Sequence, residues 1–143
     1  MMSKRHRKIL LRRFHHLYRP YPLYTTSVCV YCCGPANTLD HVPPLSVTAM
    51  RAESGARLGD CWLYPSCADC NKRLNSFQST NIAVRRGYVA AKLLSKHSRT
   101  LNMPEWSDEE LAELGCSLKS YIQNESVRKR AIEDRIYNLV SRD

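Results

Sequence analysis

The chain has 143 residues, close to the commonest size of a single domain, and carries a formal net charge of +9. Its hydrophobic fraction of 43% and charged fraction of 24% are ordinary for a soluble protein, and no stretch approaches the roughly eighteen apolar residues needed to cross a bilayer. These features argue against a membrane protein and against a second independent core.

Positive charge is concentrated in the first two thirds of the chain. Residues 1–39 carry a net charge of +7, residues 40–103 carry +5, and residues 104–143 carry −3. This distribution predicts a polyanionic partner, with nucleic acid as the first candidate. The alternative is a solvated basic face that only keeps the protein soluble. The N-terminus lacks the apolar region of a secretory signal, so we expect a reducing cytoplasm.

Residues 1–24 are interpreted as a basic N-terminal arm. Leu10, Phe14 and Leu17 recur at helical spacing, and the prolines in residues 19–22 end any helix there. The arm is either a nucleic-acid surface or a flap packed against the rest of the protein.

Residues 25–100 are predicted to form the core of the protein. A short strand is expected at residues 38–42, and residues 61–64 are rich in strand-forming side chains, with Pro65 closing that second strand. The segment between them is interpreted as the loop of a hairpin, with a short helix at residues 46–53.

Helices are predicted from there to the end of the chain. Ser79, Thr80 or Asn81 can cap a helix that runs to about residue 96. In the C-terminal extension, residues 101–143, a capping-box sequence at 107–110 precedes a helix through Ile122, and a last helix starts at Asn124 or Ser126. The fold class is therefore α+β. The apolar stripes of the extension are interpreted as core or helix-pairing surface. The alternative is that they form the contact of a homodimer.

Two Cys-x-x-Cys turns predict a structural zinc ion. Cys29 and Cys32 form one turn, Cys67 and Cys70 form the other, and 34 residues separate the two turns. Such turns bring two thiolates to one ion, and four thiolates leave no open position for substrate. The alternatives are buried free thiols or another metal, and Cys33 is a second choice for the Cys32 position. Cys61 and Cys116 lack partners at ligand spacing and are expected in the core.

Three residues with chemistry suited to phosphodiester hydrolysis lie beside these turns. Asp40 and Asn71 offer hard oxygen donors of the kind that hold Mg²⁺ or Mn²⁺, and His41 can take a proton near neutral pH. Taken alone, an Asp-His pair in a strand is more often a surface hydrogen-bonded pair, and an asparagine at this place caps a helix. The flanking cysteine turns favour the catalytic interpretation. The candidate phosphate-binding cations are Arg12, Arg13, Lys72, Arg73, Arg85 and Arg86.

The motifs Cys29-x-x-Cys32, Asp40-His41-Val42-Pro43-Pro44 and Cys67-x-x-Cys70-Asn71 resemble the HNH, or His-Me finger, endonuclease superfamily in its four-cysteine form. The resemblance covers residues 29 to about 76. The asparagine directly after the fourth cysteine is more like the phage endonuclease VII branch than like members with histidine there. The resemblance implies a ββα-metal core in which zinc ties the hairpin to the helix, His41 is the general base, and Asp40 and Asn71 hold the catalytic Mg²⁺ or Mn²⁺.

The sequence thus predicts a metal-dependent endonuclease that hydrolyses DNA and leaves 5′-phosphate and 3′-hydroxyl ends. Branched or nicked DNA is included among the substrates, and small stand-alone enzymes of this kind are often encoded by phages. One alternative is a zinc-containing module that binds nucleic acid without cleaving it, in which the Asp-His pair is only a brace. Another is a structural protein that joins partners through its C-terminal helices.

Overall fold

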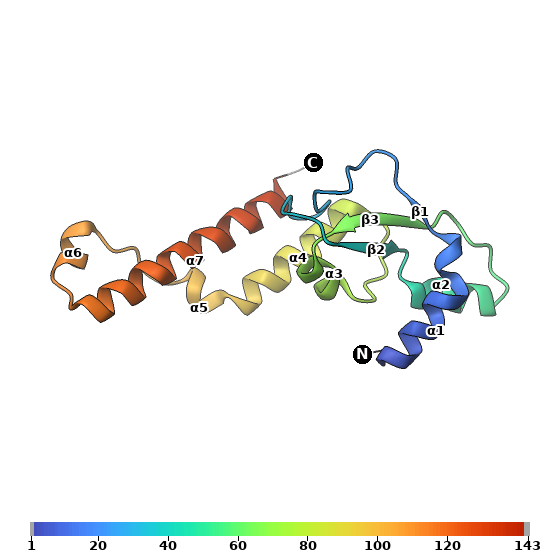
Figure 1. Ribbon diagram of the computed structural model, residues 1–143, viewed down its shortest axis with the longest axis horizontal. Coiled ribbons are helices and arrows are strands. Elements are labelled where there is room, and N and C mark those ends of the chain that lie inside the picture. Colours follow the sequence, from blue (N-terminus) through green and yellow to red (C-terminus); the bar gives the residue numbers. More distant parts are fainter. Residues whose placement is uncertain (1, 142–143) are drawn as a thin grey trace.

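The computed structural model describes residues 2–141 and shows a small sheet at one end of the molecule, with a helical arm projecting from it (Figure 1). Helices dominate and the strands form one three-stranded sheet, which confirms the α+β class. The elements are α1 (Lys4–Phe14), the 3-10 turn η1 (His15–Leu17), β1 (Arg19–Pro20), β2 (Thr38–Val42), α2 (Leu45–Glu53), β3 (Trp62–Ser66), α3 (Ala68–Leu74), α4 (Ile82–Lys96), α5 (Ser98–Leu101), α6 (Asp108–Ala112) and α7 (Cys116–Val140).

The sheet has the order β1-β3-β2. β2 and β3 are antiparallel, with Asp40 opposite Tyr64, and the predicted strand at residues 38–42 is confirmed. The second strand differs from expectation because it continues through Pro65 to Ser66. The Pro65 carbonyl accepts a bond from the Val30 amide on the side away from β2, so the amide hydrogen that proline lacks is not needed by the β2 ladder. The two-residue β1, parallel to β3, was not anticipated.

The loop between β2 and β3 contains α2, close to the predicted helix at residues 46–53. After β3 the chain enters α3 directly. The Cys67 sulfur accepts a hydrogen bond from the Cys70 amide, and the Asn37 side chain accepts one from the Ala68 amide, which together cap the start of α3. β2, β3 and α3 therefore form a ββα unit with a cysteine at its strand-to-helix junction.

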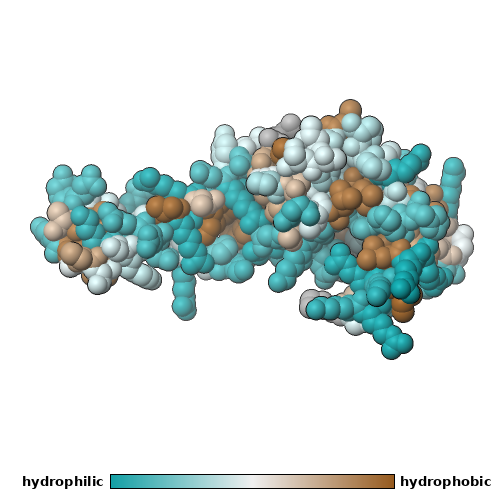
Figure 2. Space-filling model, in the orientation of Figure 1, coloured by the Kyte–Doolittle hydropathy of each residue, from teal (hydrophilic) through white to brown (hydrophobic). Residues whose placement is uncertain are grey.

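The basic N-terminal segment is folded onto the core. Leu10 and Phe14 of α1 are buried with Leu45 and Ala49 of α2, and η1 then leads into β1. Figure 2 shows mostly hydrophilic side chains over α1 on the face in view. The spacing of the apolar residues predicted this helix, and its apolar stripe is what holds it against α2.

The C-terminal helices differ from the predicted boundaries. Asn81 caps α4 as expected, and the Ser107 capping box is present, but it starts only the short α6. Gly115 then precedes α7, a single helix of 25 residues in which Asn124 and Ser126 are internal. The Ser126 hydroxyl donates to the Ile122 carbonyl, a bond that lets serine sit inside a helix rather than start one.

α7 runs along α4 and returns to the sheet end of the molecule, where Leu139 joins the main hydrophobic core (Figure 1). That core also contains Cys29, Tyr31 and Cys70 from the cysteine turns and Val89 from α4. No helix within residues 2–141 has the length and apolar character that a membrane span requires.

Candidate functional site

The four cysteines of the two Cys-x-x-Cys turns converge on one point. The Sγ atoms of Cys29, Cys32, Cys67 and Cys70 all lie within 4.8 Å of one another, and those of Cys32 and Cys67 are 3.8 Å apart. Zinc–thiolate bonds of about 2.3 Å in a tetrahedron separate the sulfurs by about 3.8 Å, so the cluster fits one metal ion such as zinc. Hydrogen bonds from the other three thiols lower the pKa of Cys29 well below its usual value.

The remaining cysteines lie outside this cluster. Cys33 has a left-handed backbone (φ +65°) and is half-buried, so it follows the first turn without joining the four sulfurs. Cys61 is buried, as predicted. Cys116 is exposed at the start of α7, and its predicted place in the core is wrong, because α6 and Gly115 carry this end of α7 away from the core.

A cation from α7 lies against the cysteine cluster. Arg135 places Nη2 3.1 Å from the Cys70 sulfur and 3.8 Å from the Cys67 sulfur, while its Nη1 is 2.6 Å from the Asp69 carboxylate. Asp69 also pairs with Arg73 at 2.8 Å. Burial raises the pKa of Asp69, but the hydrogen bonds from Arg73 and Arg135 outweigh this effect and leave the pKa below its ordinary value. Arg135 thus links the last helix to the thiols of the second turn.

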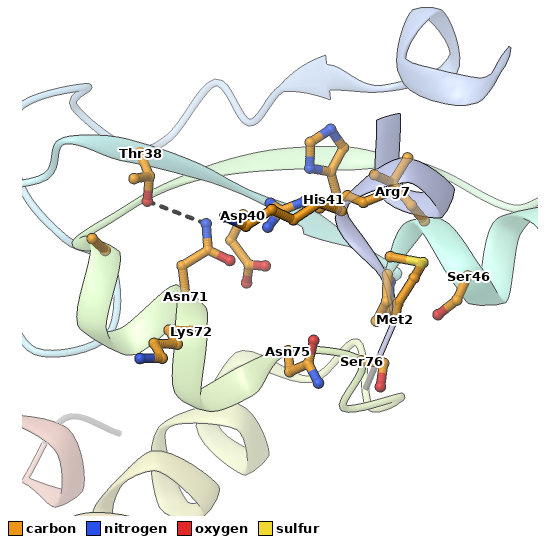
Figure 3. A pocket seen from close by; sticks show the side chains of 14 residues that line it. Met2, Arg7, Thr38, Asp40, His41, Ser46, Asn71, Lys72, Asn75 and Ser76 are labelled. Atoms are coloured by element: carbon orange, nitrogen blue, oxygen red, sulfur yellow. Dashed lines mark hydrogen bonds between the residues drawn. The ribbon is translucent and has the colours of Figure 1, made fainter. Parts of the chain in front are cut away.

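An open cavity of about 630 Å³ lies beside the ββα unit. Asp40 and His41 of β2 and Asn71 of α3 all line it, so the fold brings the three predicted catalytic residues to one cavity (Figure 3). Figure 3 also shows the Asp40 carboxylate and the Asn71 amide facing the same space between β2 and α3. The titratable or amide side chains that line the cavity include Lys4, Arg7, Asp40, His41, Asn71 and Lys72.

The Asp40 carboxylate is only 3% exposed and is held at one oxygen. Oδ2 accepts hydrogen bonds from the Tyr31 hydroxyl and from Arg85 Nη2, the latter at 2.6 Å. Oδ1 accepts no bond from any residue between 2 and 141 and is the oxygen left for a ligand in the cavity. Burial raises the pKa of Asp40 above its ordinary value, against the opposing effect of the Arg85 guanidinium.

Arg85 corrects the sequence prediction. The sequence suggested a phosphate contact, but the side chain is fully buried, with Nε donating to the Tyr31 hydroxyl at 3.0 Å and Nη1 donating to the carbonyls of Phe77 and Ser79. All of these partners are internal, and a buried guanidinium cannot reach nucleic acid. Arg85 is instead the counterion of Asp40.

Replacing Arg85 with alanine should destabilise the protein by about 3–5 kcal/mol, because it leaves the Asp40 carboxylate buried without its cation. The measurement is urea unfolding followed by circular dichroism. Arg99→Ala, at an exposed arginine of α5, is the matched control and should change the unfolding free energy by less than about 0.5 kcal/mol. Equal stabilities of the two variants would contradict the assignment.

Asn71 is oriented by β2. Its Nδ2 donates to Thr38 Oγ1 at 3.2 Å and to the Leu39 carbonyl at 3.1 Å. With the amide nitrogen fixed to the strand, the amide oxygen is turned toward the cavity that Asp40 also lines (Figure 3). The alternative that Asn71 caps a helix does not hold, because Asn71 lies inside α3 and Cys67 is the cap.

His41 neighbours Asp40 in β2, and successive side chains of a strand point to opposite sides. Its ring stands away from the Asp40 carboxylate (Figure 3). The Nε2 atom of this ring lies 2.9 Å from Nδ1 of His15, in η1. Tyr18 packs edge-on against the ring at 4.7 Å between centroids. Burial, followed by the charges of His15 and Arg7, lowers the pKa of His41 to about 4, so the imidazole is neutral at pH 7.

The remaining predicted phosphate-binding residues occupy different surroundings. Lys72 is exposed at the cavity, and Arg12 and Arg13 are exposed on α1, where Arg13 lies 4.0 Å from Glu53. Arg73 is paired with Asp69, as described above. Arg86 donates to the Val30 carbonyl at 3.0 Å and so braces the first cysteine turn. Of this group, only Lys72 lines the cavity.

Sequence reasoning missed Lys4, Arg7 and His15, which α1 and its C-terminal cap bring to the site. Their spacing of three and eleven residues puts them on one helix face, next to the apolar stripe that packs on α2. This helical spacing is the feature of the sequence that could have identified these residues. Tyr31 and Arg135 carried no such signal, because their contacts join residues far apart in the sequence.

The chain matches no family model, no curated protein and no solved structure. A functional conclusion therefore rests on the residues and their geometry.

Proposed function

We propose that the protein is a metal-dependent endonuclease of the HNH, or His-Me finger, kind that hydrolyses DNA phosphodiester bonds. The observation that carries the proposal is the convergence of Asp40, His41 and Asn71 on one cavity, next to a four-cysteine cluster at the junction of the two strands and the helix. This is the arrangement that the resemblance in the motifs implies. The cavity thus brings together a carboxylate, an imidazole and an amide from two segments that lie about 30 residues apart in the sequence.

The four-cysteine cluster is assigned a structural zinc ion. Four thiolates close the coordination sphere, so the chemistry falls to the cavity residues. The bond between Cys70 and Asn71 ties the cluster to the cavity, and seven residues connect Cys32 to Asp40. The cluster thus fixes the position of the site without entering the reaction.

Asp40 Oδ1 and Asn71 Oδ1 are the oxygens that would hold the catalytic Mg²⁺ or Mn²⁺, since their other polar atoms are occupied by Arg85, Tyr31 and β2. When bound, such an ion supplies Lewis-acid stabilisation of charge on the scissile phosphate and the leaving 3′ oxygen.

His41, neutral at pH 7, accepts the proton of the attacking water. Lys4, Arg7 and Lys72 line the cavity with positive charge for the flanking phosphates. The products carry 5′-phosphate and 3′-hydroxyl ends.

The test is incubation of purified protein with supercoiled plasmid and Mg²⁺ or Mn²⁺, with and without a chelator. Metal-dependent nicking that stops on chelation is the expected result. A panel of linear, nicked and four-way-junction DNA then identifies the substrate shape. No cleavage of any DNA substrate with any divalent metal would contradict the proposal.

One observation favours a second candidate, a zinc-containing module that binds nucleic acid without cleaving it. Asp40 is in a buried ion pair with Arg85, which is also what a purely structural brace would show. This candidate predicts salt-sensitive DNA binding, measured by fluorescence anisotropy, in a protein that leaves plasmid intact.

Replacing Arg135 with glutamine should weaken zinc binding by about tenfold to a hundredfold, because the guanidinium contacts two of the four thiols. The measurement is competition with a chromogenic chelator. Arg130→Gln, at an exposed position five residues earlier on α7, is the control and should leave the affinity unchanged. Equal zinc affinities of the two variants would show that Arg135 does not support the cluster.

A further inference from the structure

Residues of the N-terminal helix line the cavity, and the cap of that helix contacts one of the cavity residues. Lys4 and Arg7 line it from α1, and His15, the C-cap of the same helix, reaches His41. The apolar stripe of this helix is buried on α2, so the face bearing these residues is held in place from behind. α1 therefore lines one side of the cavity, and η1 contacts the cavity residue His41 through His15.

His15 occupies one of the two ring nitrogens of His41. The contact between His15 Nδ1 and His41 Nε2 is 2.9 Å, the length of a hydrogen bond, and one proton lies between the two nitrogens when both rings are neutral. If His41 is the donor, its Nδ1 carries a free lone pair. If His15 is the donor, His41 Nδ1 carries the proton and cannot accept another one.

The segment that carries His15 is fixed by Tyr18. The Tyr18 hydroxyl donates to the Pro43 carbonyl at 2.5 Å and lies 2.7 Å from Thr48 Oγ1, and the Tyr18 amide donates to the His15 carbonyl at 3.0 Å. Tyr18 is buried, and its ring also contacts the His41 ring. His15 is thus anchored three residues before a buried tyrosine that touches the same imidazole.

We propose that His15 is the positioning residue of His41: its Nδ1 accepts the His41 Nε2 proton and so leaves the lone pair of His41 Nδ1 for the proton of the attacking water. This assignment rests on the proposed nuclease function and adds to it the atom that acts as the base. His41 Nδ1 makes no hydrogen bond to any residue between 2 and 141, so no residue of the described chain competes with a water there. Fixing a tautomer through the second ring nitrogen is a recurrent way to prepare a catalytic histidine.

Three substitutions test the role of His15 in positioning His41. His15→Phe keeps a ring of similar size against Tyr18 and His41 but has no acceptor. His15→Asn restores an acceptor, the amide oxygen, without the imidazole. His16→Phe, at the exposed neighbour, is the matched control.

The first readout is long-range proton–nitrogen NMR of ¹⁵N-labelled histidine side chains near neutral pH, which separates protonated from bare ring nitrogens without requiring cleavage. We expect a bare His41 Nδ1 in the wild type, in His15→Asn and in His16→Phe, and a mixture of the two tautomers in His15→Phe. A protonated Nδ1 in the wild type, or an unchanged tautomer in His15→Phe, would overturn the proposal.

The second readout is single-turnover cleavage of the DNA identified by the substrate panel. His15→Phe should lower the maximal rate by about tenfold to a hundredfold with little change in the DNA concentration needed for half-maximal rate, and His15→Asn should recover part of the loss. Full activity in His15→Phe would mean that the ring only packs, which also overturns the proposal. A wild type that shows the His15-dependent bare Nδ1 but cleaves nothing would refute the nuclease and leave the His15 assignment supported.

Discussion

Replacing His41 with alanine should lower the rate of DNA cleavage by about a hundredfold to ten-thousandfold, the range expected when a general base is removed. The imidazole is neutral at pH 7 because burial lowers its pKa to about 4, so its ring carries an unprotonated nitrogen throughout the neutral range. His41 contacts neither the cysteine cluster nor the Asp40–Arg85 pair through any hydrogen bond within residues 2–141. Its removal should therefore spare metal content and DNA affinity.

The measurement combines single-turnover nicking with zinc content and fluorescence anisotropy on the same preparations. His97→Ala is the matched control, because His97 is a half-buried histidine at the C-terminal cap of α4 and does not line the cavity. It should cleave like the wild type. Undiminished nicking by His41→Ala would refute the assignment of the base, and a parallel loss of zinc would show that the residue is structural.

The parts of the fold that were predicted correctly are those with strong local signals. The strand at residues 38–42 ends at two prolines, and Asn81 caps α4 with its own side chain. The four-cysteine cluster followed from spacing alone, because each Cys-x-x-Cys turn is a local structure that needs only a second turn to complete it. Caps, strand ends and metal-binding turns of this kind can be recognised in the sequence without knowing the tertiary fold.

The errors have long-range causes. Arg85 looked like a surface cation beside Arg86, but its partner Asp40 is 45 residues away, so the pair forms only when folding brings α4 and β2 together. A last helix was predicted to start at Asn124 or Ser126 because these residue types favour helix starts, yet α7 is continuous through both and contacts α4 and α5. Burial against distant elements overrides local propensity in both cases.

The candidate site shows the same contrast between local motifs and long-range contacts. Asp40, His41 and Asn71 were identified from the sequence, and the structure brings all three to one cavity. What orients them was not identified: Arg85 and Tyr31 hold Asp40, β2 holds Asn71, and His15 holds His41. The candidate catalytic residues lie in recognisable motifs, whereas the residues that support them are brought to them by long-range packing.

Replacing Cys32 with serine should remove most of the zinc and lower the midpoint of thermal unfolding by about 10–20 °C, whereas replacing Cys33 should do neither. Binding of a structural metal is part of the folding free energy, and a loss of about 5 kcal/mol corresponds to a shift of this size for a chain near 150 residues. The sequence left both cysteines as ligand candidates. The structure places the Cys32 sulfur in the cluster and turns the chain away at Cys33, whose backbone is left-handed.

The comparison is unusually well matched, because the two cysteines are adjacent and the same substitution is made at each. Zinc content by mass spectrometry and unfolding by circular dichroism are measured on Cys32→Ser, Cys33→Ser and the exposed Cys116→Ser. A chelator should lower the midpoint of the wild type and of the Cys33 and Cys116 variants but have little further effect on Cys32→Ser, since the metal has already been lost. Equal zinc losses from Cys32→Ser and Cys33→Ser would contradict the ligand set. A metal-free wild type with an unchanged midpoint would show that the four thiols support the fold without an ion.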